Sequence, residues 1–494
     1  MGDVRMSRVG GFGRSFALLV ALAFLLTTGV PGAFARGPAR TKTVIHLGAL
    51  ITMSATGDPD TQVALQLAVE DFNAFFAGRG SRLGRGSHHR VRLTVEGTGL
   101  DPDVALEKIE LLAVRGLNVV IGPESSAEVE AIKPFTDAND MVLLSHCSTA
   151  PSLAIPGDSV YRLVPSDLHQ AAAIARLIVR DGKRAIVPMW RAGVWGDDIS
   201  SAASQQFVEL GGTVYPGVRF DPQAVDFSGD LAALTAQVEQ ARASFGGAVA
   251  VAFFGFGTEG AAVLAQAADF PALGAVTWYG SDGTALSREI LGDPRAAGFA
   301  VQTGFFNTLF ADVHTPKADA VRERISAAIG GGSVHFCAMA AYDAVWLAAL
   351  SAAVVGTRDI DRFKRALVAI ADSYEGATGP TTLDAAGDRA DAAYDVWAIQ
   401  EENGQPVWRT VSQTIAGFEG AVGDERTVLR ATSAGAALAR VNSLAAASAA
   451  KHNPRHSPPA EVVPPAGIRT APPRARPRAA SSDGRSRPAA SRRA

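Results

Sequence analysis

Two neighbouring strand-to-helix junctions of this 494-residue sequence carry hydroxyl groups. Residues 122–126 follow an apolar strand predicted at 118–121, and residues 145–151 follow the next strand, predicted at 141–144. Each junction leads toward a helical start, whose first turn has unpaired N–H groups and a partial positive charge. For one junction alone, simple N-capping by Ser or Thr is the better explanation. Two adjacent junctions of the same kind favour a site for a carboxylate or a phosphate.

Two carboxylates occupy comparable positions further along the chain. Asp167 opens a helix that we expect to end at Arg180, and Asp282 lies in the Gly280–Gly283 turn after a strand predicted at 275–279. Taken singly, Asp167 is better explained as a helix cap and Asp282 as a turn residue beside glycine. Hydroxyls for a carboxylate, together with two acids for an ammonium, suit a zwitterionic α-amino acid.

A glycine motif supports a different function, that of an NAD-dependent oxidoreductase. Gly255, Gly257 and Gly260 form a G-x-G-x-x-G between a predicted strand and a predicted helix, and Asp282 follows about 20 residues later. The basic and then apolar start of the sequence predicts export, and an exported protein has little access to nicotinamide cofactors. The N-terminal segment also lacks the Arg-Arg pair used to export folded proteins. The glycines also suit a tight turn that lines a cleft. We therefore expect no cofactor and no enzymatic activity, with the dehydrogenase kept as an alternative.

Other catalytic and metal sites have weak support in the sequence. There is no G-x-S-x-G nucleophile elbow. His146 stands near Ser145 and Ser148, but a catalytic Ser–His pair requires a hydrogen bond between the two side chains, which the sequence does not show. Cys147 and Cys337 are the two cysteines of the sequence, too few for a Cys-rich metal site. An inert Cys147 is favoured over a reactive thiol. A bridge between the two cysteines depends on their Cα separation, so it stays open.

Alternating strands and helices must position these junctions. Between about 42 and 412, short β-branched runs alternate with segments of helical periodicity such as 61–76 and 101–115. This alternation indicates an α/β architecture of parallel sheets with helices on both faces. Because one sheet of more than ten strands is unusual, we expect two doubly wound lobes, with ligands beyond the carboxyl ends of the strands. The remaining predicted strands are 44–50, 91–97, 184–190, 213–219 and 248–254.

The overall composition excludes two classes of protein. Hydrophobic residues make up 47 % of the sequence, which excludes wholesale disorder. The formal net charge is −3, without the basic surplus that is typical of a nucleic-acid binder.

The two ends of the sequence differ from its middle. Residues 1–35 combine early arginines, an apolar run at 16–26 and small residues before a cut after Ala35, which is typical of a secretory signal peptide. The run is shorter than the roughly 20 residues of a membrane span, and no Cys stands near the cut, so we expect a periplasmic or secreted protein without a lipid anchor. We expect no second long apolar run. Residues 436–494 are rich in Pro, Ala and Arg and are predicted to be a disordered basic tail.

Several motifs in order resemble those of one family. The chain from about 42 to 412 is similar to the type I periplasmic binding proteins of the leucine/isoleucine/valine-binding class, which serve ABC transporters. The segment 376–397 resembles the C-terminal signature of that class. The other motifs that carry the resemblance are 122–126, 145–151, 161–167, 194–196, 280–283 and 341–345.

The resemblance implies a set of ligand-binding residues. Ser126 and Thr149 match the hydroxyls that hold the ligand α-carboxylate. Asp167 and Asp282 match acids that hold the ammonium, although the second position is commonly Glu. The other matches are the Cys147 backbone carbonyl near the ammonium, Trp195 as the aromatic cover from the second lobe, the apolar wall residue Phe336, and Phe256 (or Gly257) at a position that is often Tyr. The stretch 54–60 departs from the usual aromatic-bearing loop, so the identity of the ligand side chain stays open.

The resemblance also implies a mechanism without bond chemistry. The first lobe would comprise 42–163 plus 305–375, and the second 164–304 plus 376–412. A ligand that contacts both lobes shifts a hinge equilibrium toward closure, and the closed monomer would dock on membrane permease subunits. The same module can instead sense its ligand for a signalling partner, and the sequence does not separate these roles.

Overall fold

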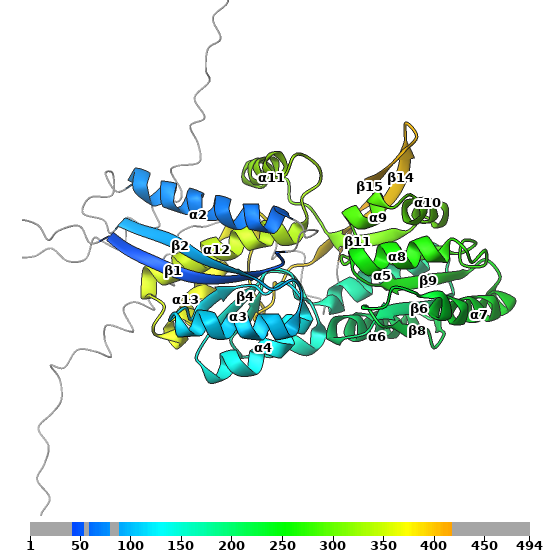
Figure 1. Cartoon of the computed structure of the whole chain (residues 1–494), viewed down its shortest axis with the longest axis horizontal. Helices are drawn as coiled ribbons and strands as arrows, with labels where there is room; N and C mark the ends of the chain where they lie inside the picture. Colours follow the sequence, from blue (N-terminus) through cyan, green and yellow to red (C-terminus); the bar gives the residue numbers. More distant parts are fainter. Residues whose placement is uncertain (1–41, 54–58, 80–87, 417–494) are drawn as a thin grey trace, which may run out of the picture. The chain divides into compact units, whose positions relative to one another are not determined.

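The computed structural model describes residues 42–53, 59–79 and 88–416. Within these residues the chain forms two α/β lobes (Figure 1), which confirms the predicted fold class. The predicted signal peptide at 1–35 and the predicted tail at 436–494 lie outside the described residues.

The first lobe is built on a five-stranded parallel sheet in the order β2-β1-β3-β4-β5. Its strands are β1 (Lys42–Ile51), β2 (His88–Gly97), β3 (Val119–Ile121), β4 (Val142–Ser145) and β5 (Val160–Arg162). The helices around it are α2 (Pro59–Arg79), α3 (Pro102–Val114), α4 (Ser126–Ala138), the 3₁₀ turn η2 (Pro151–Leu153), α11 (Pro316–Ala328), α12 (Phe336–Val355) and α13 (Ile360–Ala371).

The residue pattern of β1 explains why this sheet is covered on both faces. Successive side chains of a strand point to opposite faces. Leu47 and Ala49 pack into a core shared with α2 and α12, whereas Leu50 packs into a second core with α3 and α4. Both faces of the strand are therefore buried, as its nearly continuous apolar run requires.

Helix α12 contradicts the expectation that no second long apolar run exists. By length and composition it is apolar enough to cross a membrane, but 78 % of its most apolar stretch is buried inside the protein. It lies on the first sheet and against α2 and α13. A helix that is apolar all round is the core helix of a lobe when its neighbours cover it on every side.

The second lobe contains a mixed sheet in the order β15-β14-β11-β10-β9-β6-β7, with β8 also paired to β6. The parallel strands are β6 (Ala185–Arg191), β7 (Thr213–Val214), β8 (Val218–Phe220), β9 (Val249–Phe254), β10 (Thr277–Gly280) and β11 (Phe306–Phe310). The helices around them are α5 (Asp167–Arg180), α6 (Val194–Glu209), α7 (Ser228–Phe245), α8 (Gly257–Ala267), α9 (Arg288–Gly292) and α10 (Pro294–Thr303).

The second sheet departs from the all-parallel prediction at one edge. Strands β14 (Ala393–Glu402) and β15 (Gln405–Ala416) form an antiparallel hairpin, and β14 is also antiparallel to β11. Asn403 and Gly404 form its turn with φ of 53° and 75°. Positive φ at both turn residues is the geometry for which an Asn-Gly pair is suited, so the hairpin has a local cause.

The lobe boundary near 305 also differs from the prediction. Strand β11 pairs in parallel with β10, so the segment assigned to the first lobe begins with a strand of the second sheet. The chain enters the first lobe again only at α11 and returns after the short strands β12 (Glu375–Gly376) and β13 (Gly379–Pro380).

A buried ion pair joins two places at which the chain passes between the lobes, the end of β5 and the segment between β13 and β14. The Arg162 guanidinium binds both carboxylate oxygens of Asp388 and donates to the Ala150 carbonyl at 2.7 Å. Arg162 is 0 % exposed and Asp388 is 2 % exposed. Because neither charge reaches water, the pair fixes the connecting segments only as long as both partners are present.

Candidate functional site

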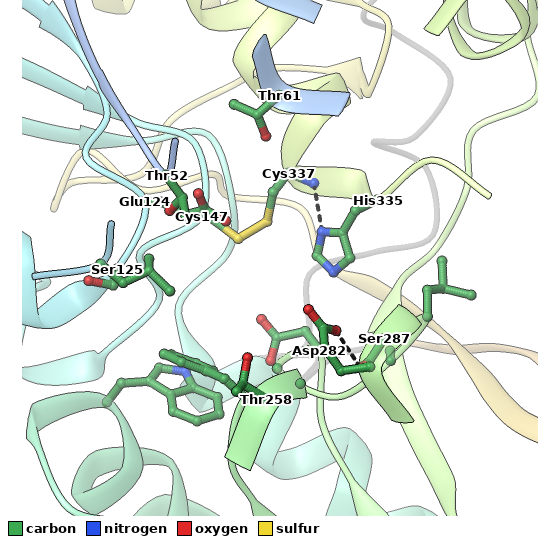
Figure 2. Close-up of a pocket in the computed structure, with 18 of the residues that line it drawn as sticks. Thr52, Thr61, Glu124, Ser125, Cys147, Thr258, Asp282, Ser287, His335 and Cys337 are labelled. Atoms are coloured by element: carbon green, nitrogen blue, oxygen red, sulfur yellow. Dashed lines mark hydrogen bonds between the residues drawn. A yellow bond between two sulfur atoms is a disulfide. The ribbon is translucent and has the colours of Figure 1, made fainter. Parts of the chain in front are cut away.

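A cavity of about 200 Å³ lies between the two lobes (Figure 2). The first lobe supplies residues that follow β1, β3 and β4 and residues at the start of α12. The second lobe supplies residues that follow β9 and β10 and the first turn of α6. The cavity thus lies beyond the carboxyl ends of both sheets, where the topology of open α/β sheets places ligands.

Five of the eight site residues expected from the sequence line this cavity. They are Ser126, Cys147, Trp195, Phe256 and Asp282. The other three, Thr149, Asp167 and Phe336, are at most 5 % exposed and are not part of the cavity lining.

Ser126 is positioned as a hydrogen-bond donor. Its Oγ accepts from the backbone N–H of Thr149 at 3.3 Å and of Ala150 at 3.2 Å, and lies 3.0 Å from Ser148 Oγ. Because two N–H groups already donate to this oxygen, the hydroxyl has its own proton to give, either to Ser148 or to a carboxylate in the cavity.

Thr149 does not offer its hydroxyl to the cavity in this conformation. Its Oγ1 donates to Asp167 Oδ2 at 2.7 Å and accepts from Trp195 Nε1 at 3.0 Å. These hydrogen bonds join Thr149 of the first lobe to two helices of the second lobe, to Asp167 at the start of α5 and to Trp195 in the first turn of α6. Here Thr149 therefore contacts Trp195 across the cleft.

Asp167 and Asp282 form a buried pair of acids. Burial is the main cause that raises the pKa of both, and the nearby Asp282 charge raises the pKa of Asp167 further. One oxygen of each, Oδ1, has no hydrogen-bond partner among the described residues. Two buried acids with free oxygens hold a cation between them more readily than they hold two negative charges.

Aromatic side chains form the wall of the second lobe. The Trp195 and Phe256 rings lie 4.7 Å apart, and the Arg191 guanidinium lies 3.9 Å from the centre of the Phe256 ring. A Cβ at Gly283 would lie 2.8 Å from the Trp195 ring and 2.5 Å from the Gly255 carbonyl oxygen. Glycine at 283 is therefore needed for the indole to approach the β10 junction.

The G-x-G-x-x-G motif is used for packing. It spans the turn from β9 to α8, where a Cβ at Gly257 would lie 2.6 Å from Ser287 Oγ. The first turn of α8 already has an anion, since Glu259 Oε1 accepts from the Phe256 N–H at 2.8 Å. A carboxylate in that position competes with a pyrophosphate for the helix N-terminus, so the geometry does not favour a dinucleotide there.

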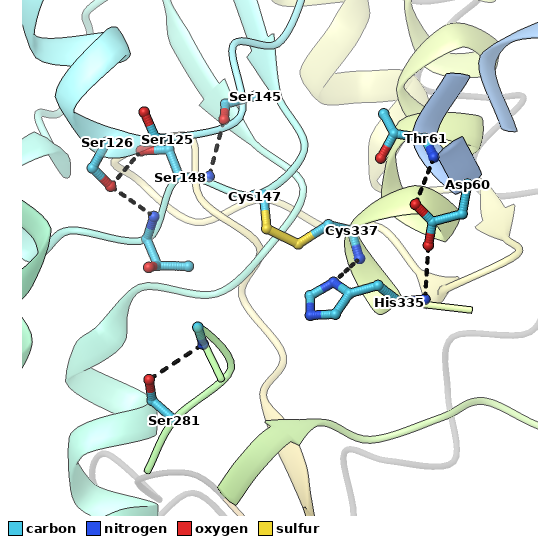
Figure 3. The surroundings of a disulfide bond; sticks show 12 residues. Asp60, Thr61, Ser125, Ser126, Ser145, Cys147, Ser148, Ser281, His335 and Cys337 are labelled. Carbon is cyan, nitrogen blue, oxygen red and sulfur yellow. Dashed lines mark hydrogen bonds between the residues drawn. A yellow bond between two sulfur atoms is a disulfide. The ribbon is translucent and has the colours of Figure 1, made fainter. Parts of the chain in front are cut away.

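Cys147 and Cys337 form a disulfide with a Cα–Cα separation of 5.2 Å, which settles the question left open by the sequence (Figure 3). The bond ties the β4 junction to the first turn of α12 and lines the cavity. His335 lies beside it, and the sulfur and imidazole ligand atoms are all within 4.8 Å of one another. Since the two sulfurs are bonded to each other, they are not available as thiolate ligands for a metal.

The sequence analysis did not identify three acids of the cavity as site residues. Asp60, Glu124 and Glu289 line it together with His335. Glu124 belongs to the 122–126 junction, yet its direction is fixed only by the turn between β3 and α4. Burial, together with the nearby Glu128 and Asp60, raises the pKa of Glu124 to about 7.

Comparison with known proteins identifies the family. Residues 60–402 match the family described as the receptor family ligand binding region, and the chain belongs to this family. It is 28 % identical over 389 residues to an uncharacterised protein of Methanocaldococcus jannaschii, covering 74 % of this chain and 89 % of the relative. A substrate-binding protein of a chemotactic signal transduction system from Halobacterium salinarum is 30 % identical over 149 residues, 28 % of this chain and 34 % of that protein.

Solved structures share the fold. The leucine-binding protein of Thermotoga maritima matches with a TM-score of 0.58 and 19 % identity, covering 75 % of this chain and 99 % of its own. A solute-binding protein of an ABC transporter from R. palustris in complex with benzoate matches with a TM-score of 0.59 and 16 % identity, covering 76 % and 98 %. The chain therefore has the type I periplasmic-binding-protein fold found in ABC-transporter solute-binding proteins.

Proposed function

We propose that this chain is an extracytoplasmic solute-binding protein of an ABC transporter that binds an amino acid between its lobes. The observation that carries the proposal is Asp282, a 7 % exposed carboxylate that lines the cavity and has an oxygen without a partner among the described residues. A buried carboxylate in a polar cavity is stabilised by a ligand ammonium. The predicted signal peptide supports a location outside the cytoplasm.

The two ends of an α-amino acid fit different parts of the cavity. Ser126 presents a donor hydroxyl on the first lobe, and Asp282 presents an acceptor on the second. A ligand that uses both groups contacts both lobes, so its binding free energy favours the closed arrangement. Trp195 and Phe256 supply the apolar wall.

Calorimetric titration of the purified chain tests this function. We expect at least one L-amino acid to bind, and Asp282→Asn to weaken its affinity at least tenfold, because the ammonium loses its charged partner. Asp269→Asn is the matched control, since Asp269 is exposed, pairs with Arg295 and lies outside the cavity lining. Binding of NAD without binding of any amino acid contradicts the proposal.

A sensory role is the second candidate. The similarity to a substrate-binding protein of a chemotactic system favours a sensory role over an oxidoreductase. Transport and sensing need the same cavity, so they differ in the partner. Co-purification with permease subunits supports transport, and co-purification with a membrane signalling protein supports sensing.

A further inference from the structure

The cavity has an excess of negative charge. Four acids line it, namely Asp60, Glu124, Asp282 and Glu289, and the described lining residues include no Lys or Arg. The lining also contains His335, whose Nδ1 accepts from the Cys337 N–H at 3.2 Å. One imidazole does not balance four acids, in whichever form it is present.

The acids differ in how far the protein satisfies them. Both oxygens of Asp60 are bound by backbone N–H groups, from Thr61 at 2.8 Å and His335 at 3.1 Å. Glu289 Oε2 accepts from Ser287 Oγ at 2.9 Å. These two acids are therefore partly compensated by neutral donors of the protein.

Glu124 and Asp282 come from opposite lobes, and neither faces a Lys or Arg among the described residues. The groups that face Glu124 are the Thr52 hydroxyl, His335 and two further acids, Glu128 and Asp60. Glu128 itself is engaged in the cap of α4, where it binds the Ser125 N–H and hydroxyl. Among the described residues, Glu124 thus faces the cavity beside other acids and no Lys or Arg, while Asp282 keeps an unpaired buried oxygen on the other side.

We propose that the ligand carries a second cationic nitrogen, so that it is a basic amino acid such as lysine or ornithine. Its α-ammonium contacts Asp282 and its side-chain cation contacts Glu124. This inference rests on the proposed function, because it assumes that the cavity binds an amino acid. One ammonium balances the charge of one of the two carboxylates, and a second cation balances the charge of the other.

Titration calorimetry of the full chain with matched ligands tests the inference. L-lysine and L-norleucine differ by the terminal nitrogen, and cadaverine has both nitrogens of lysine without the carboxylate. We expect lysine or ornithine to bind at least tenfold more tightly than norleucine, and cadaverine to bind more weakly than lysine. Equal or tighter binding of norleucine overturns the inference and leaves the proposed function intact. Cadaverine as the tightest ligand, or no binding of any amino acid, overturns both.

A pair of variants assigns the effect to Glu124. Glu124→Gln keeps the size of the side chain and removes its charge, so we expect the lysine affinity to fall at least tenfold and the norleucine affinity to change less than twofold. Glu130→Gln is the control, because Glu130 is exposed on α4 outside the cavity lining. An equal loss for lysine and norleucine means that Glu124 only shapes the cavity, and it refutes the second cation site.

Discussion

Replacing Glu124 by Gln should stabilise the ligand-free protein above pH 7 and leave its stability unchanged in acid. Burial raises the pKa of Glu124 from 4.5 to about 7, and Glu128 and Asp60 add to this effect, against the Thr52 hydroxyl and His335. Between these two pH values the folded protein holds a proton that the unfolded chain has released. The stability contributed by the protonated group is therefore lost as pH rises through this window.

The size of the effect follows from the pKa shift. A shift from 4.5 to about 7 corresponds to roughly 3 kcal/mol of folding free energy at 1.36 kcal/mol for each pKa unit. Because the Glu124 side chain is only partly buried, solvent screens part of its charge, so we expect the variant to gain about 1–3 kcal/mol at pH 8. Gln mimics the protonated acid, so the difference between the variant and the original protein should vanish below pH 4.5.

Urea unfolding followed by circular dichroism at several pH values from 4 to 8, without ligand, measures this difference. The other buried acids titrate in both proteins and cancel in the comparison, and Glu130→Gln should show no pH-dependent gain. A variant that is less stable than the original protein at pH 8 would refute the reasoning. That result would mean that Glu124 is ionised and paired in the empty protein, which would also remove the basis for a second ligand cation.

Three other predictions concern the links between segments. Asp388→Asn leaves the buried Arg162 guanidinium without its counter-charge, and urea unfolding should show a loss of about 3–5 kcal/mol; a loss below 1 kcal/mol would contradict the burial of the pair. Replacing Cys147 and Cys337 together by Ala opens a link across 190 residues and should cost about 2–5 kcal/mol, measured as a lower thermal midpoint; an unchanged midpoint would contradict a stabilising disulfide. Trp195→Phe removes the indole N–H that crosses to the first lobe, so ligand affinity should fall about two- to tenfold and small-angle scattering should show a larger radius of gyration without ligand; an unchanged radius would show that this bond does not hold the lobes together.

The position of the cavity could be predicted because strand order and direction leave few choices. Ser126 and Asp282 each follow a parallel strand, and parallel strands bring their carboxyl ends to one edge of a sheet. The sequence pattern needs only the locations of the strands to place these residues near a ligand. Five of the eight expected residues line the cavity for this reason.

The direction of individual side chains could not be predicted in the same way. Thr149 lies in the expected junction, but its hydroxyl is bound by Asp167 and Trp195, and this depends on the approach of α6 from the other lobe. His335 reaches the cavity because the first turn of α12 is tied to the β4 junction by a disulfide that spans 190 residues. Such contacts arise from tertiary packing, which no local pattern encodes.

The same carboxylates that recognise a basic ligand can also control closure of the lobes. With the cavity empty, Glu124 of the first lobe and Asp282 of the second line one cavity as acids whose charged forms are disfavoured by burial. A ligand with two cations stabilises both charged forms when the lobes close on it. Moving a hinge from 1 % to 99 % closed needs about 5.5 kcal/mol of differential binding. Two charge-assisted hydrogen bonds, at about 1.5–3 kcal/mol each, supply most of that amount, whereas a neutral side chain supplies only one of them. The same two carboxylates would then both select a ligand with two cations and favour closure of the lobes.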